Sequence, residues 1–357
     1  MNLSNNQLLL EKTVQNIKPV RKELIVRAYE RLDNLTKPKR SLGLLEEMAA
    51  RLVAIIGGEK PVLGKRRICV FVGDHDVVQE GISAYPQEVT LAMAKNFIAG
   101  RAAINVLARR AGAEIEVIDI GMANDPGGLS GLVRQNVRRG AGNIAKGPAM
   151  TVAEALQAIA VGIERANIAI EQNINILATG EMGIGNTTPA AALHAAYLGL
   201  PAAKLVGPGT GLDASGVKKK IEVVNSALKA NKSRCSGALE TLAALGGLEI
   251  AGICGLCLGA ASRSKPVAVD GFISGAGALA AMRICPAVKD YLFFAHVSAE
   301  PGHRKFFEVE NLRPIVDLDM RLGEGTGAAI AMQIMEDALA IYNEMATFAE
   351  AGIAPGA

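Results

Sequence analysis

One acidic residue has a setting that favours chemistry over simple solvation. Glu324 lies between Gly323 and Gly325, just after a predicted strand and just before an apolar helix. A carboxylate placed in this way can act as a general base that accepts a proton from a substrate. It can also do no more than complement the positive end of the helix dipole. The pattern alone leaves both interpretations open.

Two glycine-rich segments have the character of anion-binding sites. The segment GEMGIGNTTPAAA (residues 180–192) follows a predicted strand, and we expect a threonine cap and Pro189 to begin a helix there. Backbone N–H groups at such a helix start can bind a phosphate or a carboxylate. The segment VGPGTGLD (206–213) leads into another helix, with Asp213 as its expected cap. At most two of the lysines at 218–220 can then face a site, because successive helical residues point in different directions.

Two other groups of residues suggest metal or redox chemistry, and we expect neither. The segment GDHD (73–76) contains potential metal ligands, but no ligand spacing links it to the three remaining histidines. Cys254 and Cys257 form a C-x-x-C pair in an apolar, glycine-rich run with no second cysteine pair nearby. We therefore interpret both thiols as buried structural groups.

Composition restricts the class of protein. The chain has 357 residues, of which half are hydrophobic, 39 are glycine and only 4% are aromatic, with a net charge of +3. This charge is too small to indicate a nucleic acid partner, although it would not repel a phosphorylated substrate. The longest apolar stretch, at 250–262, is too short to span a bilayer, and no signal peptide is visible. Five cysteines fit a reduced compartment, so we expect a cytoplasmic protein without a membrane partner.

Alternating strands and helices predict the architecture that must position these groups. The predicted strands cover residues 68–72, 115–120, 174–179, 266–270, 292–295 and 314–318. Long helices between them, such as 87–111 and 214–230, predict an α/β fold: a mainly parallel sheet with helices on both faces and ligands at the carboxyl ends of the strands. Helical patterns at 24–32 and 44–55 and a last helix from 326 to about 350 could form a small bundle.

Together the glycine-rich segments resemble those of nicotinate-nucleotide–dimethylbenzimidazole phosphoribosyltransferases. Segment 180–192 is similar to their GExGxxNTTPAAA signature, and RLGEGTGAA (321–329) is similar to their RLGEG[ST]GAA segment. Further similar segments lie at 73–75, 84–90, 142–145, 270–274 and 298–303, so the resemblance covers nearly the whole chain in one order. The chain departs from the family pattern at Asp76 and Arg40, where glycine is usual, and at Pro208 inside the second glycine-rich loop.

The resemblance implies a fold, a reaction and a set of site residues. It implies a Rossmann-like catalytic domain (63–330), a small helical domain from both termini (1–62 and 331–357) and a homodimer. The implied reaction converts nicotinate mononucleotide and 5,6-dimethylbenzimidazole into α-ribazole 5′-phosphate and nicotinate, with Glu324 as the general base. No metal and no cofactor are implied. The implied ribose-phosphate residues are Glu181, Gly183, Gly185, Asn186, Lys220 and Ser298, and the implied base-binding residues are Tyr85 and Met93.

The chemistry of this reaction explains why one carboxylate is enough. Nicotinate leaves C1′ as a neutral pyridine, so no general acid has to protonate it. The N–H of the attacking benzimidazole becomes strongly acidic as its other nitrogen bonds to carbon, and a single carboxylate can take that proton. Glycosidases, in contrast, require a pair of carboxylates. No pyrophosphate leaves, so no Mg²⁺ is expected.

Three alternatives remain at this point. The same chemistry could act on another base, such as a purine, another benzimidazole or a phenol, because the residues of the base pocket are the least specific part of the pattern. The chain could also be a non-catalytic subunit, although the presence of Glu324 argues against it. An NAD-dependent oxidoreductase fits poorly, because the dinucleotide-binding fingerprint is absent.

Overall fold

A six-stranded parallel sheet forms the centre of the structure, a computed structural model that describes residues 3–354. The strand order β3-β2-β1-β4-β5-β6 is that of a Rossmann fold, with the order reversing between β1 and β4. The predicted α/β class is therefore confirmed. The strands are β1 (Lys65–Gly73), β2 (Ala113–Gly121), β3 (Leu132–Arg134), β4 (Ile174–Met182), β5 (Val267–Val269) and β6 (Leu292–Phe294).

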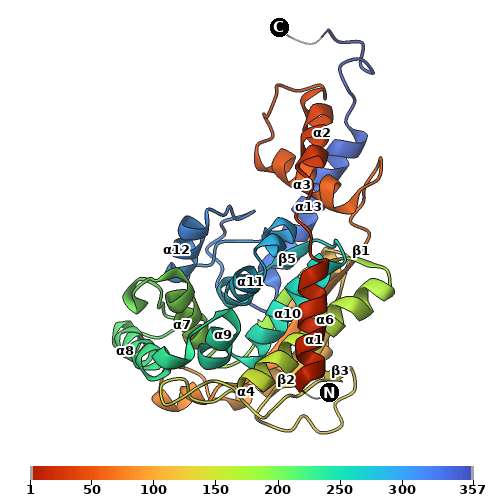
Figure 1. The fold of residues 1–357 in the computed structure, drawn as a ribbon. Helices are drawn as coiled ribbons and strands as arrows, with labels where there is room; N and C mark the ends of the chain where they lie inside the picture. Colours follow the sequence, from red (N-terminus) through yellow and green to blue (C-terminus); the bar gives the residue numbers. More distant parts are fainter. Residues whose placement is uncertain (1–2, 355–357) are drawn as a thin grey trace.

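Helices cover both faces of this sheet (Figure 1). α10 and α6 pack tightly together on one face, with α1 outside them, whereas α4, α5 and α13 pack on the other face. The α6–α10 contact depends on small residues, since a Cβ on Gly255 would lie 2.0 Å from the carbonyl oxygen of Ile159. The helices are α1 (Leu3–Asn16), α2 (Lys22–Asp33), α3 (Leu44–Ile56), α4 (Glu88–Ile98), α5 (Ala103–Arg110), α6 (Val152–Glu171), α7 (Thr187–Leu198), α8 (Ala214–Asn231), α9 (Ala238–Leu245), α10 (Leu248–Ser262), α11 (Phe272–Ile284), α12 (Pro301–Glu310) and α13 (Thr326–Glu344).

Several predicted elements need correction. The strand predicted at 314–318 is wrong: Val316 forms only an isolated bridge with His296, and Pro314 at the start of this segment has no N–H to donate to a ladder. The helix predicted at 87–111 is two helices, because Gly100 adopts a φ of +74° between α4 and α5. The last helix ends at Glu344 rather than near residue 350.

Segments from the two ends of the chain meet in a helical bundle that projects from the body (Figure 1). α3 packs against α2 and α13, while α1 packs against α6 and α10 of the main body. Arg31 Nε donates to the carbonyl oxygen of Tyr342 at 2.8 Å, and Asn343 Nδ2 donates to that of Pro61 at 2.8 Å. These bonds tie the two termini together. The domain boundaries at residues 62 and 330 stay a prediction.

The longest apolar stretch of the sequence is the central helix α10. Cys254 and Cys257 lie in it as buried free thiols. Burial raises the pKa of Cys257 to about 12 and holds the pKa of Cys254 well above its usual range. Thiols in this state are poor nucleophiles and poor metal ligands, as expected for core residues. Within residues 3–354, no helix is long and apolar enough to cross a membrane.

Candidate active site

A cleft opens at the carboxyl ends of the strands, beside the point where the strand order reverses. Its walls are the segments that follow β4, β5 and β6, together with the loops before α8 and α13. Ligands of open α/β sheets bind at this kind of position. The enclosed space is about 80 Å³, less than the roughly 300–1,000 Å³ of common ligand pockets. A nucleotide must therefore extend toward the mouth, where Leu322 is 57% exposed.

The backbone at Glu324 adopts a conformation that residues with side chains seldom adopt. Its φ is +63°, and the flanking Gly323 and Gly325 also have positive φ values, +83° and +95°. This left-handed conformation costs roughly 1–2 kcal/mol for a residue with a Cβ. The carboxylate is buried, and its Oε2 accepts a hydrogen bond from the Ile104 N–H, at the first turn of α5, at 3.4 Å. Burial raises the pKa of Glu324, which makes it a better proton acceptor near neutral pH.

The start of α13 is complemented by Asp270 rather than by Glu324. Asp270 Oδ1 accepts the Ala328 N–H at 2.9 Å, and Oδ2 accepts the Gly325 N–H at 3.2 Å. Asp270 itself is held by Thr179, whose Oγ1 accepts the Asp270 N–H at 3.0 Å. The purely structural interpretation of Glu324, as the partner of this helix dipole, therefore loses its main support.

Glu181 stands beside Glu324 at the end of β4 and is uncharged at neutral pH. Burial, together with the nearby Asp270 and Glu249 carboxylates, raises the pKa of Glu181 to about 8. Asn186 Nδ2 donates a hydrogen bond to Glu181 Oε2. Gly323 has to be a glycine here, because a Cβ would lie 2.2 Å from Glu181 Oε1. A protonated Glu181 beside an amide is suited to bind a hydroxyl group such as those of ribose.

Lys220 is the one buried lysine of the three at 218–220. Its Nζ donates to Thr187 Oγ1 at 2.6 Å and to the carbonyl oxygen of Gly207 at 3.4 Å, behind the cleft wall formed by Thr187 and Gly209. Burial lowers the pKa of Lys220 to about 8, although Glu300 opposes this shift. Asp213 caps the helix that carries this lysine, as expected, by accepting the Gly216 N–H at 2.8 Å.

The cap predicted for the first helix at the cleft is wrong. The N-cap of α7 is Asn186, without a side-chain cap bond, and Thr187 is its first residue. The Thr188 hydroxyl is buried and has no partner in the described part of the chain. Asn186 is engaged with Glu181 and does not cap this helix. The Thr188 N–H donates to the carbonyl oxygen of Gly185 at 3.1 Å and Pro189 has no N–H, so the first turn can offer the N–H of Thr187, which lines the cleft.

The sequence-predicted residues separate into two groups. Glu181, Gly183, Asn186 and Ser298 line the cleft. Lys220 lies directly behind it, and Glu324 is next to the lining residue Gly323, as described above. Three predicted residues, Gly185, Tyr85 and Met93, are not part of the walls. Gly185 packs against Val78, and Met93 is partly buried against the core. Tyr85 precedes α4, and its side chain is 53% exposed.

Sequence reasoning assigned no role to two charged residues of the cleft, Glu300 and Arg321. Glu300 Oε1 accepts the Gly209 N–H at 2.7 Å, while Arg321 Nη1 donates to the carbonyl oxygen of Gly209 at 3.2 Å. The Glu300 N–H in turn donates to Ser298 Oγ at 3.3 Å. The two residues thus hold the loop before α8 against the cleft. Their positions inside segments similar to the family were the available signal.

The candidate metal segment 73–76 is used for internal contacts. His75 Nε2 lies 2.8 Å from Glu249 Oε1, and both side chains are buried. Burial would lower the pKa of His75, but the Glu249 carboxylate outweighs it and raises the pKa. Asp74 Oδ2 accepts the Ala123 N–H at 2.8 Å. Across residues 3–354, no group of three His, Cys, Asp or Glu side chains could hold a metal ion.

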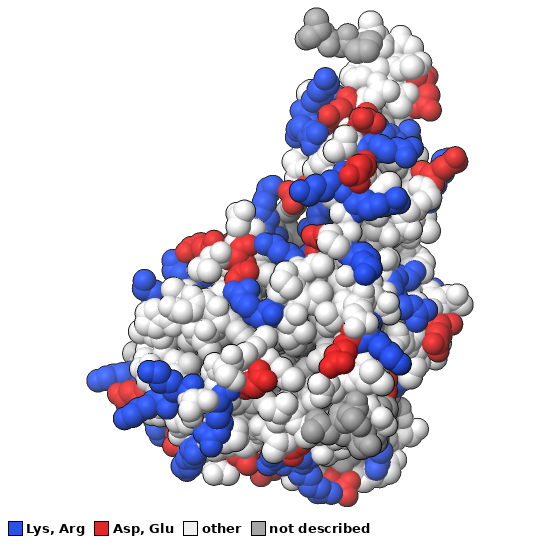
Figure 2. All heavy atoms as spheres, in the orientation of Figure 1, with Lys and Arg blue, Asp and Glu red and all other residues white. Residues whose placement is uncertain are grey.

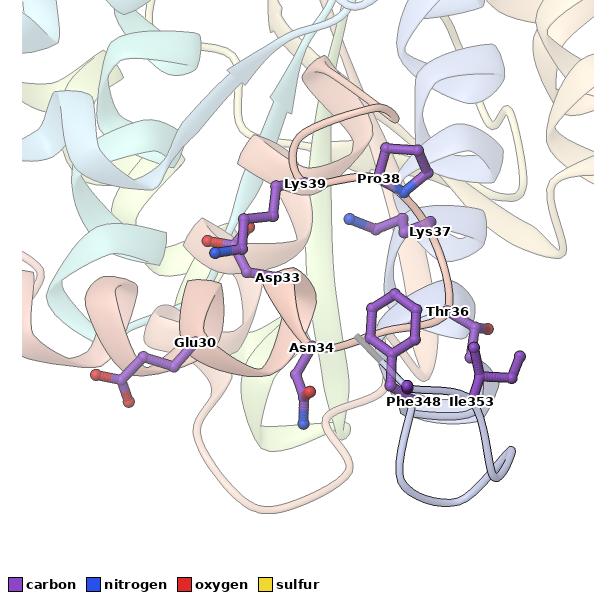
Figure 3. Close-up of a pocket in the computed structure, with 10 residues that line it drawn as sticks. Glu30, Asp33, Asn34, Thr36, Lys37, Pro38, Lys39, Phe348 and Ile353 are labelled. Atoms are coloured by element: carbon purple, nitrogen blue, oxygen red, sulfur yellow. The ribbon is translucent and has the colours of Figure 1, made fainter. Parts of the chain in front are cut away.

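A more spacious hollow, of about 920 Å³, lies away from the sheet, between the loop after α2 and the C-terminal segment (Figure 3). Two of its charged residues, Lys37 and Asp33, already have partners. Lys37 Nζ is 2.8 Å from Glu46 Oε1, and Asp33 Oδ1 is 3.0 Å from Arg40 Nε. The strand-end cleft, in contrast, contains carboxylates without basic side chains beside them, so it is the better candidate for catalysis.

Comparison with known proteins agrees with the geometry of the cleft. A family model described as Phosphoribosyltransferase matches residues 17–353. A relative from Pelodictyon phaeoclathratiforme is 52% identical over 347 residues, which are 97% of each chain, and one from Geobacter sulfurreducens is 50% identical over 348 residues, 98% of this chain and 99% of the relative. Both are named nicotinate-nucleotide–dimethylbenzimidazole phosphoribosyltransferase. The chain belongs to this family.

Solved structures show the same fold in this phosphoribosyltransferase family. The crystal structure of CobT from Thermus thermophilus has a TM-score of 0.90 and 47% sequence identity, and the match covers 94% of this chain and 100% of that one. The resemblance stated from the motifs is confirmed, and with it the transferase class. Of the departures from the family pattern, Arg40 has a φ of +61°, a conformation that favours the usual glycine. The ion pair with Asp33 and a stacked position 3.5 Å above the Tyr29 ring offset part of this cost.

Proposed function

We propose that this protein transfers the phosphoribosyl group of nicotinate mononucleotide to 5,6-dimethylbenzimidazole, forming α-ribazole 5′-phosphate and nicotinate for the lower ligand of cobalamin. The observation that carries this proposal is the Glu324 carboxylate. It is buried beside the first turn of α5, on a strained backbone, and Asp270 has taken over the capping of α13. A costly backbone conformation that is not needed for folding is typical of a functional residue.

In this mechanism Glu324 accepts the N–H proton of the benzimidazole while its other nitrogen bonds to C1′. Burial raises the pKa of Glu324 and so increases its basicity, whereas the hydrogen bond from the Ile104 N–H favours the ionised form. Nicotinate departs as the C1′–N bond breaks and takes that electron pair, so it needs no proton. One base therefore completes the proton balance.

The ribose phosphate is bound at the other side of the cleft. Lys220 supplies positive charge for the 5′-phosphate, and Thr187, at the start of α7, supplies an N–H donor. Glu181, Asn186 and Ser298, which line the cleft, contact the ribose. Exposed lysines gather over α8 on the same side (Figure 2); they are Lys218, Lys219 and Lys229. Their field favours the approach of a phosphorylated substrate.

The benzimidazole binds on the α4 side of the Gly183–Asn186 loop, next to Tyr85 and Met93. The Ile184 N–H of this loop donates to Thr90 Oγ1 of α4 at 3.1 Å, so α4 and the cleft wall are directly connected. Tyr85 precedes α4, and Met93 lies one turn beyond Glu88, where it is only partly buried. An exposed phenol ring and a flexible thioether are suited to a flat heterocycle.

The protein acts in the cytoplasm as a homodimer in this proposal. The projecting bundle exposes large apolar side chains, among them Val26, Val62 and Ile353, each more than half exposed. Exposed apolar groups on a projection are suited to contact with a second chain. Light scattering coupled to size-exclusion chromatography distinguishes a dimer from a monomer of 37.2 kDa.

The reaction itself is tested by incubating the pure protein with nicotinate mononucleotide and a panel of bases, including dimethylbenzimidazole, adenine and a phenol. We expect dimethylbenzimidazole to give α-ribazole 5′-phosphate, identified by mass spectrometry, with one nicotinate released per product. Faster turnover with a purine or a phenol would reassign the acceptor. No turnover with any base would contradict the proposed function.

A further inference from the structure

Three of the four histidines of the chain lie together behind the cleft, where α12 packs against α7 and α11 (Figure 1). They are His194 of α7, His296 after β6 and His303 in the first turn of α12. The ring centroids of His296 and His303 are 6.3 Å apart, and Phe272 of α11 stacks on His194 at 4.7 Å. All three imidazoles are buried. The proposed mechanism uses none of them, so their role has to be found in their contacts.

The hydrogen bond of His303 fixes the protonation state of its ring. The Ser298 N–H donates to His303 Nδ1 at 2.8 Å. A ring nitrogen that accepts a hydrogen bond carries no proton, so the imidazole is neutral and its proton is on Nε2. Nε2 faces α11, where a Cβ on Gly275 would lie 3.2 Å away, and it has no hydrogen-bond partner among the described residues. The ring can therefore hold Ser298 only while it is uncharged.

The turn that His303 holds contains two residues of the cleft wall, Ser298 and Glu300. Ser298 Oγ accepts the Glu300 N–H at 3.3 Å, and the carbonyl oxygen of Glu300 accepts the His303 N–H at 3.0 Å. Glu300 Oε1 accepts the Gly209 N–H at 2.7 Å, in the loop before α8. The same loop accepts a hydrogen bond from Lys220. One ring thus fixes the 298–303 turn and, through Glu300, the loop beside the buried lysine.

The surroundings of His303 disfavour a positive charge on its ring. The titratable groups that face it are His194 from α7 and His296 from the segment after β6, two further imidazoles. The other neighbours are not titratable; they are Phe272 and Gly275 of α11 and Phe306 and Phe307 of α12 itself. Burial and the two imidazoles hold the pKa of His303 well below its usual range. The ring is therefore neutral, and the turn is held, at neutral pH.

The charged side chains of the elements around α12 do not compensate for this. Lys204 of the short helix η2 (Ala202–Lys204) is exposed, and Arg283 of α11 pairs with Glu310 at the last residue of α12. Glu300 directs its carboxylate toward the loop before α8. Within residues 3–354, no carboxylate lies within 4 Å of the His303 ring nitrogens. A protonated His303 would thus have no acidic partner.

We propose that His303 is a positioning residue whose neutral ring keeps the Ser298–Glu300 turn in place at the cleft, and that acid releases this turn. Protonation would put an N–H where Ser298 needs an acceptor, and two donors cannot share one hydrogen bond. The bond is therefore complete above the pKa of the ring and is lost as the pH falls through that value. The effect on the substrate rests on the proposed function: the ribose contact of Ser298 and the phosphate contact of Lys220 weaken together.

Hydrogen exchange of the Ser298 amide tests the turn without any substrate. Mass spectrometry of peptides that span the turn gives its protection between about pH 7.5 and about pH 4.5, a range that extends well below the ordinary histidine pKa. Protection should fall roughly tenfold or more toward the acid end, the loss expected when a buried N–H loses its acceptor. His303→Asn offers an oxygen that does not titrate, so protection should persist at both pH values. His303→Leu offers no acceptor, so protection should be low at both. Equal protection in all three proteins, or the same acid loss in His303→Asn, would overturn the proposal.

Calorimetric titration of nicotinate mononucleotide connects the turn to the substrate. Near neutral pH, His303→Leu should weaken binding roughly 5- to 50-fold, whereas His303→Asn should stay within about threefold. At the acid end, the unmodified protein should lose more affinity than His303→Asn, which subtracts the titration of the nucleotide's own phosphate.

His194→Phe is the matched control, because it removes another imidazole of the same group whose hydrogen bond goes to Phe272 and not to the turn. It should bind the nucleotide as the unmodified protein does. Unchanged affinity in His303→Leu, or an acid loss that is the same in His303→Asn, would contradict the role of His303 at the cleft. The expected exchange pattern without any nucleotide binding by the unmodified protein would instead remove the proposed function and leave the His303 turn standing.

Discussion

Charged side chains are paired at one end of the sheet and unpaired at the other. At the amino ends of the strands, opposite charges are matched: Arg67 Nη2 is 2.9 Å from Glu114 Oε1, Arg67 Nη1 is 3.5 Å from Glu116 Oε1, and Arg165 Nη1 is 3.7 Å from the same Glu116 oxygen. Gln172 Oε1 accepts a further bond from Arg67 at 2.6 Å. This end holds β1, β2 and α6 together.

At the carboxyl ends, acidic side chains without basic partners are gathered instead. In the described part of the chain, no lysine or arginine lies within 4 Å of the carboxylates of Glu181, Asp270 or Glu324, and Lys220 and Arg321 pair with no acid. Burial raises the pKa of all three carboxyl groups. The fold tolerates this destabilising arrangement because the amino end and the apolar core supply the stability. Perturbed groups gathered in a cleft are characteristic of a catalytic site.

The sharpest way to test this contrast is to neutralise Glu324. Glu324→Gln keeps the size of the side chain but removes its basic site, so kcat should fall roughly 10²–10⁴-fold, the usual range for general-base catalysis. KM for nicotinate mononucleotide should barely change, because the carboxylate acts on the other substrate. The melting temperature should stay the same or rise, since a buried carboxylate with no basic partner is lost. Normal turnover combined with a lower melting temperature would falsify the catalytic role.

Lys220 should have the next largest effect. Lys220→Ala removes the buried charge behind Thr187, so KM for nicotinate mononucleotide should rise about 10- to 100-fold, consistent with the loss of a charged hydrogen bond. KM for the base should change little. Steady-state kinetics with each substrate varied in turn measures both values, and equal changes would place Lys220 outside the phosphate site.

The same lysine predicts a pH dependence. Lys220 binds phosphate only when protonated, and burial lowers its pKa to about 8. Affinity for the nucleotide should therefore be complete below pH 8 and decline as the pH rises through that value, whereas an ordinary lysine stays charged to about pH 10. The pH profile of kcat/KM reports this free-enzyme pKa. Glu181, whose pKa is also about 8, contributes to the same decline through the ribose, so Lys220→Ala should remove only part of it and Lys220→Ala combined with Glu181→Gln should remove the rest.

Removing Arg67 should have a smaller effect, and it should lower the stability of the fold rather than turnover. Arg67→Met leaves Glu114 and Glu116 without their partner. Breaking a buried pair costs about 3–5 kcal/mol, but Glu114 is half exposed and screened by solvent, so we expect about 1–2 kcal/mol. Chemical denaturation measures this loss. Turnover per folded molecule should be unchanged, because Arg67 lies at the opposite end of the strands. A lowered kcat in the folded fraction would contradict the proposed division between the two ends.

The sequence predicts best where one local pattern decides the structure. β1 and β4 contain apolar runs buried between two layers of helices, and β2 enters the same core over its last five residues, so their positions could be predicted. β3 has only three residues, two partly buried and one exposed, and gave no such pattern. In the site, the glycines around Glu324 could be recognised because they are adjacent in sequence. The role of Asp270 and the gathering of three histidines behind the cleft depend on contacts between segments far apart in the chain, and composition or spacing does not encode them.

The smallest expected effect is that of a substitution at Tyr85, which lies outside the cleft walls. Its ring is 53% exposed and no cleft wall includes it, so its proposed contact with the base depends on the substrate extending past the Gly183–Asn186 loop. Stacking of a base on this ring is worth about 0.5–1.5 kcal/mol beyond burial, so Tyr85→Ala should raise KM for dimethylbenzimidazole about two- to tenfold. Tyr85→Phe is the matched control and should behave as the unmodified protein, because stacking needs the ring and not the hydroxyl. KM for the nucleotide should not change in either variant. If Tyr85→Ala has no effect on any base of the panel, the acceptor lies wholly inside the cleft, and the surface before α4 has no part in its recognition.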